Sequence, residues 1–140
     1  MVGVSRWEAD GFCRWARVRL PTEHEWEAAA RGPRGFVHPW ANEWQNGICN
    51  SPECGLEKTS PVGIFPGSVA ACGAHDMAGN VWEWCDDPYD PTEKDNPGAG
   101  RVLRGGSWSH YAEHCRSSIR INIDPDSRNL SIGFRVARTL

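Results

Sequence analysis

The side chains of this chain that could bind a metal or react with a substrate are chiefly its six cysteines and five histidines. No two cysteines stand in the Cys-x2-Cys spacing typical of zinc sites, so zinc is disfavoured and most of the thiols are predicted to be buried. Cys49 and Cys54 are close in sequence with Pro52 between them, which makes a disulfide across this loop one interpretation. His110 and His114 are the histidine pair nearest to a metal-ligand spacing, although lone histidines are more often ordinary surface or core residues.

A second group of candidate site residues lies near the end of the chain, where charged side chains alternate with side chains of no common chemical type. The charged residues are Arg116, Arg120, Asp124, Asp126, Arg128 and Arg135. Bidentate pairs between these arginines and aspartates are expected to lock the local backbone. Among the intervening residues, Ile119, Ile121 and Ile123 alternate with polar side chains, as they would on a strand with one buried face. The residues alone therefore favour a half-buried strand here.

Length and composition bound what these residues can do. With 140 residues, the chain is expected to form a single domain, residues 1–140, with a core of its own. Its net charge of −3 and the lack of a basic run argue against a nucleic-acid partner. No stretch of about 18 apolar residues occurs, so membrane insertion is not expected, and the N-terminal region shows no signal peptide. Localisation and oligomeric state stay open.

The elements that must position the reactive residues are short and separated by loops. Eight tryptophans, 15 glycines and 10 prolines indicate a loop-rich domain whose loops are held by indoles and turns. Helices are predicted over 5–16 and 22–32, the second with a capping box of Thr22 and Glu25 and a stop at Gly32. Strands are predicted over 81–85, 101–108, 118–123 and 132–137.

Seven motifs occur in this order along the chain: RLPTEHEWEAAARG, HPWANEW, SPVGIFPG, HDMAGNVWEWCDD, RVLRGGSW, CRSSIR and GFRV. They cover nearly the whole chain, and together they resemble the core of the formylglycine-generating enzyme family. The resemblance implies an α+β, C-type lectin-like fold of the formylglycine-generating enzyme subtype, with two helices, small twisted antiparallel sheets and long ordered loops. Because a fold does not by itself determine a function, the site residues must decide what this chain does.

The resemblance also implies a criterion for enzyme activity. The family's enzymes oxidise a substrate cysteine with copper held by two thiolates, soft ligands that suit Cu(I). These two cysteines correspond here to His110 and Cys115, so the thiolate pair is broken and the chain is predicted not to be an enzyme. A formylglycine-generating-type copper oxidase, or a degenerate relative of it, is the alternative.

A second resemblance concerns residues 104–136, whose frame RGGSW…CRS…R…DPD…R…GFRV is similar to the C-terminal region of variable proteins of diversity-generating retroelements. In that family, reverse transcription alters adenines of a template copy, so that asparagine codons come to encode any residue except Lys, Glu, Gln, Met and Trp. The gaps in the frame, here called the variable positions, are Ser109, His110, Tyr111, His114, Ile119, Ile121, Asn122, Ile123, Ser127, Asn129, Leu130 and Ser131. All twelve belong to the encodable types, which supports the resemblance.

The second resemblance implies a non-enzymatic protein that binds a ligand through the variable positions, which stand on a fixed scaffold. In the resembled family the corresponding strand faces outwards, so Ile119, Ile121 and Ile123 are expected to form an exposed apolar patch. The partner implied is a protein or other macromolecule at a cell surface. A lectin of fixed sugar specificity is disfavoured, because the sequence lacks the sugar-ligating Glu-Pro-Asn type triplet.

Calcium is the metal that the first resemblance implies. The family's enzymes bind it in a segment that corresponds here to Asp76, Gly79, Val81 and Glu83, with Gly79 and Val81 contributing backbone carbonyls. An ordinary Gly-Asn turn into a strand explains the same residues. No cofactor is required for ligand binding, so calcium is expected only as a structural ion.

Overall fold

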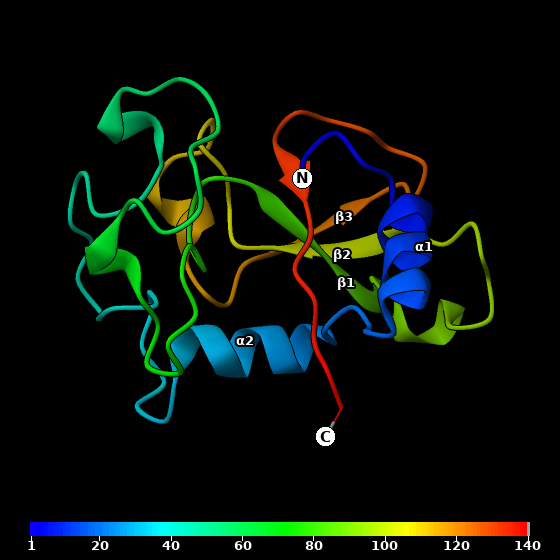
Figure 1. Cartoon of the computed structure of the whole chain (residues 1–140). Helices are drawn as coiled ribbons and strands as arrows, with labels where there is room; N and C mark the ends of the chain where they lie inside the picture. The colour runs from blue at the N-terminus through cyan, green and yellow to red at the C-terminus, as the bar shows by residue number, and fades with distance from the viewer. Residues whose placement is uncertain (140) are drawn as a thin grey trace.

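The computed structural model describes residues 1–139 of the chain. Two α-helices and one four-stranded sheet are joined by long loops (Figure 1). Their bounds are α1 Arg6–Ala16, α2 Glu23–Arg31, β1 Trp82–Pro88, β2 Arg101–Arg104, β3 Arg120–Ile123 and β4 Ile132–Gly133. Four short 3-10 helices lie in the loops: η1 Pro52–Cys54, η2 Pro66–Ser68, η3 Pro91–Glu93 and η4 Ala112–Cys115. The predicted α+β arrangement is confirmed.

Both helices begin with a capping box. In α1 the Ser5 hydroxyl accepts the amide of Glu8, and the Glu8 carboxylate accepts the amide of Ser5 at 2.8 Å. In α2 the predicted pair of Thr22 and Glu25 forms the same reciprocal bonds, at 2.9 and 3.2 Å. The second helix ends at Gly32, whose φ of 62° a residue with a Cβ would adopt only with strain. Both helix predictions are confirmed.

The sheet has the order β3-β2-β1-β4, in which β1–β2 and β2–β3 are antiparallel and β1–β4 is parallel. The expectation of purely antiparallel sheets is therefore wrong at β4. The segment 124–131 carries the chain from the edge strand β3 past α1 to the opposite edge, so that β4 runs in the direction of β1 (Figure 1). The strand predicted over 132–137 is also shorter, because between β4 and residue 139 only Ala137 pairs, with Arg19 in an isolated bridge.

The two faces of the sheet pack against different helices. One core cluster joins Ala9 and Cys13 of α1 to Trp82, Trp84 and Leu103, and it also includes Leu20 and Ile132. A second cluster joins Trp26 and Ala30 of α2 to Met77, Cys85, Val102 and Ala70. Leu103 and Val102 are neighbours on β2, so their side chains point to opposite faces of the sheet.

The long segment between α2 and β1 is held by side-chain amides rather than by regular structure. Asn80, at φ 63°, accepts the amide of Ser60 at 2.9 Å through Oδ1 and donates its own amide to the carbonyl of Asn50 at 2.8 Å. Nδ2 of Asn50 donates to the carbonyl of Lys58 at 2.9 Å. Within residues 1–139, no helix has the length and apolar character that crossing a membrane requires.

Candidate ligand-binding face

The variable positions divide into three groups by exposure. Ser109, Tyr111, Asn122, Asn129 and Leu130 are exposed, His110, His114, Ile119, Ile121, Ile123 and Ser127 are half-buried, and Ser131 is buried. Tyr111 and Leu130 are the large side chains of this set with the most exposed surface, at 62% and 70%. The exposed group is free to contact a ligand, whereas each half-buried side chain also contacts the protein itself.

The turn after β2 places two histidines against Trp82. The ring centroid of His110 lies 5.6 Å from that of Trp82 and 5.3 Å from that of His114. The indole Nε1 of Trp82 donates to Nδ1 of His110 at 3.3 Å, and the Ser107 hydroxyl lies 2.8 Å from the same nitrogen. Burial, and then the neighbouring His114, lower the pKa of His110, so its ring is neutral at pH 7. The buried indole ring of Trp82 thus supports the side chains at two variable positions, His110 and His114.

The three isoleucines near β3 do not form an exposed patch. Ile119, Ile121 and Ile123 are half-buried and pack against the core cluster that contains Trp84 and Leu103. Ile121 stands directly opposite Leu103 in the β2–β3 ladder. The exposed patch expected from the second resemblance is therefore wrong, and the half-buried strand that the residues alone favour is correct. Any exchange at these three positions must satisfy the core as well as a ligand.

Two polar variable positions are in close contact with the backbone around them. Asn122 points away from the isoleucines and lies over Gly100, where a Cβ would come within 1.8 Å of its Oδ1. The amide and hydroxyl of Ser131 both donate to Oδ1 of Asn129 at 2.9 Å, and its carbonyl accepts the amide of Trp82 at 2.8 Å. The turn that leads into β4 therefore depends on the residues at two variable positions, Asn129 and Ser131.

The predicted Arg–Asp pairs are wrong, because the carboxylate partners of the arginines come from other elements. Arg128 makes a bidentate pair with Glu8 of α1, at 2.9 and 3.1 Å. Asp124 instead shapes its own turn: its Oδ1 accepts the amide of Asp126 at 2.8 Å and its carbonyl accepts the amide of Ser127 at 3.0 Å. The segment 124–131 is thus attached to α1 through Glu8.

A largely buried ion pair joins Arg135, the second residue after β4, to β1 and α2. Nε and Nη2 of Arg135 donate to Oε2 and Oε1 of Glu83 at 2.5 and 2.8 Å. The indole Nε1 of Trp26 donates to the same carboxylate at 2.7 Å. Arg104, whose side chain is 3% exposed, pairs with Glu23 and Glu27 of α2 at 3.1 and 2.9 Å. These ion pairs connect frame residues to α2 and β1, and none of them includes a variable position.

Burial predicts different costs at two variable positions. Ile121→Ala is expected to lower the free energy of unfolding by about 1–2 kcal/mol, because it removes a half-buried side chain from the core cluster. Leu130→Ala, at 70% exposure, should change it by less than about 0.5 kcal/mol. Chemical denaturation of both variants measures the difference. Equal losses would show that the two positions do not differ in packing.

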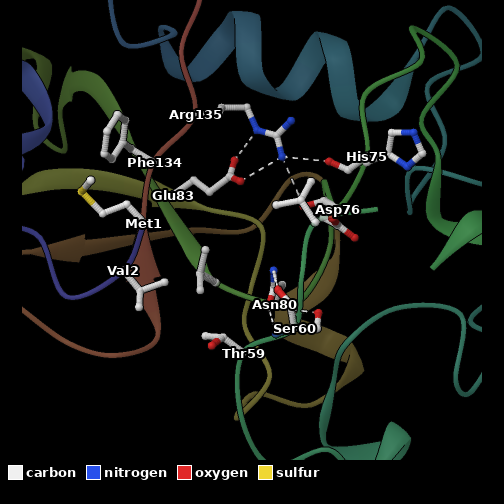
Figure 2. Close-up of a pocket in the computed structure, with 12 residues that line it drawn as sticks. Met1, Val2, Thr59, Ser60, His75, Asp76, Asn80, Glu83, Phe134 and Arg135 are labelled. Atoms are coloured by element: carbon white, nitrogen blue, oxygen red, sulfur yellow. Dashed lines mark hydrogen bonds and ion pairs between the residues drawn. The ribbon is translucent and has the colours of Figure 1, made fainter. Parts of the chain in front are cut away.

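Three of the four residues predicted to bind calcium lie at one cavity (Figure 2). Asp76, Val81 and Glu83 line a space of about 500 Å³, whereas Gly79 does not line it. Asp76 has a φ of 54°, and its side chain is buried with Oδ2 accepting the amide of Gly63 at 2.7 Å. A carboxylate and backbone oxygens are therefore present, which are the atoms that calcium would need.

A guanidinium already engages the Glu83 carboxylate and the backbone carbonyl of Asp76. Arg135 pairs with both carboxylate oxygens of Glu83, and its Nη2 also donates to the carbonyls of His75 and Asp76 at 3.1 and 3.2 Å (Figure 2). A dication beside Glu83 would stand next to this positive charge and compete with it for the same acceptors. The residues in this arrangement do not fit calcium.

We therefore expect calcium removal to have little effect on stability. Excess EGTA should change the melting temperature by less than about 1 °C. Removing an ion lowers the melting temperature only if that ion binds the native state, and we expect no calcium to be bound there. Differential scanning fluorimetry with and without added calcium makes the measurement. A rise of several degrees with calcium that disappears in Asp76→Asn would contradict this expectation and restore the predicted site.

Four of the six cysteines, Cys13, Cys49, Cys85 and Cys115, are buried, which confirms the prediction that most of the thiols are buried. The disulfide between Cys49 and Cys54 is wrong: the Cys54 thiol donates to Oδ1 of Asn50 at 3.3 Å, and the Cys49 thiol contacts that of Cys115. The Cys115 thiol approaches the carbonyl of His110 at 3.9 Å, while the ring of His110 is turned to Trp82. Across residues 1–139, no group of three or more His, Cys, Asp or Glu is arranged to hold a metal.

Comparison with known proteins shows which proteins are similar to this chain. The profile of the sulfatase-modifying factor enzyme 1-like domain (FGE-sulfatase) matches residues 1–140. Inactive C-alpha-formylglycine-generating enzyme 2 of Mus musculus is 39% identical over 153 residues, which cover 98% of this chain and 48% of that protein. The formylglycine-generating enzyme of Streptomyces coelicolor is 38% identical over 164 residues, or 98% and 52%. This chain spans about half the length of these relatives.

A solved structure connects the fold to the second resemblance. Treponema denticola variable protein 1 is similar with a TM-score of 0.73 and 37% sequence identity, over 85% of this chain and 46% of that one. The predicted C-type lectin-like fold of the formylglycine-generating enzyme subtype is thereby confirmed, as is the similarity to a variable protein. The fold is shared by enzymes and by a variable protein, so it leaves the function to the site residues.

Proposed function

Since this chain belongs to the sulfatase-modifying factor enzyme 1-like family, we propose that it uses the family's fold to bind a ligand and not to oxidise a substrate. The variable positions make the contacts with the ligand, and the frame beneath them is made by other residues. Diversification of the variable codons by a retroelement then changes the ligand and leaves the scaffold in place.

The observation that carries this proposal is that the ion pairs of the frame include none of the variable side chains. The charged groups that hold residues 104–136 to the rest of the protein end on Glu8, Glu23 and Glu83, on α1, α2 and β1. Tyr111 and Leu130 meanwhile extend into solvent. Support also comes from the similarity to a variable protein and to an inactive member of the enzyme family.

The proposed partner is a protein or other macromolecule, presented at a cell surface. The variable positions extend over the turn after β2, over β3 and over the segment 124–131, a spread that suits an extended contact better than a small molecule in a cavity. Tyr111 supplies an amphipathic aromatic anchor of the kind that paratopes use. A net charge of −3 does not suit a nucleic-acid ligand.

Deep sequencing of the 3′ end of this gene across its source population tests the proposal. Substitutions should gather at the twelve variable codons and spare the codons of the frame, such as Arg104, Arg128 and Arg135. The new residues should exclude Lys, Glu, Gln, Met and Trp if asparagine codons of a template are the source. Variable codons as constant as the rest of the gene would refute diversification.

The alternative, a formylglycine-generating-type copper oxidase or a degenerate relative, is favoured by the similarity to active enzymes of the family. Its test is oxygen consumption by the copper-loaded protein with a cysteine-containing peptide, compared with Cys115→Ala. We expect no difference between the two proteins, because His110 stands at the position of one thiolate. Oxygen uptake that depends on Cys115 would overturn the non-enzymatic proposal, whereas copper binding alone would not.

A further inference from the structure

Two buried thiols from distant parts of the chain meet beside the turn that carries the first variable positions. Cys49 lies in the loop between α2 and β1, and Cys115 is the last residue of η4. Their relative exposures are 1% and 0%, and the two thiols are in hydrogen-bonding contact. Because 65 residues lie between positions 49 and 115 in the sequence, the contact is made by the fold and not by the local chain.

Glycine turns fix the backbone around both sulfurs. A Cβ on Gly79 would lie 3.3 Å from Sγ of Cys49, and one on Gly106 would lie 2.8 Å from Sγ of Cys115. The two glycines have φ of 73° and 74°, and the amide of Gly79 donates to the carbonyl of Gly105 at 2.8 Å. The sulfurs are therefore held at the junction of two turns that are hydrogen-bonded to each other.

In the folded protein, the reduced thiols of Cys49 and Cys115 are expected to react slowly with disulfides. The hydrogen bond with Cys115, and then burial, raise the pKa of the Cys49 thiol above its usual range, so this thiol stays protonated at neutral pH. Thiolates are the species that react with disulfides, and the buried sulfurs are shielded from reagents. Oxidation is therefore expected while the chain folds, before both sulfurs are covered.

We propose that Cys49 and Cys115 form a disulfide when the protein folds in the presence of a small-molecule disulfide such as oxidised glutathione. One cysteine thiolate attacks the S–S bond of the reagent, which gives a mixed disulfide and releases one glutathione thiolate. The other cysteine thiolate attacks the mixed disulfide, forms the protein S–S bond and releases the second glutathione thiolate. Two protein thiols are oxidised, one small-molecule disulfide is reduced, and the two thiol protons pass to solvent.

The bond would attach the loop between α2 and β1 to η4, and so hold the turn 105–111 on the scaffold. Closing a loop of 66 residues should raise the melting temperature by roughly 10 °C, by restricting the unfolded chain. The added stability would not depend on which side chains occupy His110, Tyr111 or His114. The inference stands on the contact between the two thiols and holds whether or not these positions are diversified.

The first test counts the thiols of the wild-type protein after refolding in a mixture of oxidised and reduced glutathione. Alkylation under denaturing conditions should label four of the six cysteines, and all six after reduction. Trypsin combined with a glutamate-specific protease cuts after Glu53 and separates Cys49 from Cys54. We expect one linked peptide pair that contains Cys49 and Cys115, lighter than the two free peptides by two hydrogen atoms. Six labelled cysteines, or a bond from Cys49 to Cys54, would overturn the proposal.

The second test compares melting temperatures before and after reduction. The wild type should lose roughly 10 °C on reduction, whereas Cys49→Ala should lose none. Cys72→Ser, which changes an exposed thiol, and Cys54→Ser are the matched controls and should behave like the wild type. An equal loss in Cys49→Ala would overturn the assignment. The thiol count on the wild type decides the question even if a variant fails to fold.

Discussion

Replacing Glu83 by alanine is expected to lower the free energy of unfolding by about 3–5 kcal/mol, which is a large part of the stability of a small domain. The variant leaves the guanidinium of Arg135, whose side chain is 25% exposed, without its carboxylate. It also leaves the indole N–H of Trp26, which is 1% exposed, without an acceptor. The cost comes from these stranded groups more than from the lost attraction.

Two further variants separate the causes. Glu83→Gln keeps an acceptor for Trp26 and removes the charge, so its loss should lie between those of the wild type and Glu83→Ala. Arg128→Ala breaks a bidentate pair of the same type, but both partners are exposed, and its melting temperature should fall by less than about 2 °C. Denaturant titration measures the losses of the two Glu83 variants, and a thermal melt measures that of Arg128→Ala. A loss below about 1 kcal/mol in Glu83→Ala would show that the pair does not stabilise the fold.

The helices could be predicted because their signals are local. The capping box of Thr22 and Glu25 and the stop at Gly32 lie within one stretch of sequence, and the structure forms both. The direction of β4 could not be predicted in this way. Whether a strand is parallel to its neighbour depends on how the chain crosses the sheet, which no residue within β4 encodes.

The partners in the site could not be predicted for the same reason. The sequence identifies Arg128 as a frame residue, but its partner, Glu8, lies 120 residues away on α1. The alternation of Trp82 and Trp84 predicts that they share a face, yet the contact of Trp82 with His110 depends on the turn after β2. The alternation of the isoleucines was by contrast a reliable local signal, since it predicts the half-buried strand that the fold contains.

Because half of the variable positions are half-buried, the ligand-binding face is also part of the structure of the domain. Ile119, Ile121 and Ile123 pack on the core cluster, and Ser131 is 7% exposed and contacts the backbone of β1. A charged residue at one of these positions would lose hydration without gaining a partner. Diversification should therefore be broad at exposed positions and filtered by folding at the others.

A display library tests this division without any knowledge of the ligand. Each variable codon is replaced by a mixture of any two bases followed by a pyrimidine, and folded variants are selected by resistance to protease. At the exposed positions Tyr111 and Leu130, the encoded residues should survive with frequencies that differ by less than about threefold. Aspartate at Ile119, Ile121 or Ile123 should fall by at least about tenfold, since burying an unpaired charge costs more than the 1.4 kcal/mol that a factor of ten requires.

The matched control is the same mixture at Arg104, Glu83 and Arg135, where nearly every substitution should be lost because each leaves a buried or half-buried charge without its partner. Equal tolerance at all twelve variable positions would contradict the packing of the isoleucines against the core. Equal intolerance at Tyr111 and Leu130 would contradict a scaffold that accepts different side chains, and with it the proposed binding function. The expected gradient, from exposed to buried positions, would mean that folding and not only the ligand selects which diversified proteins persist.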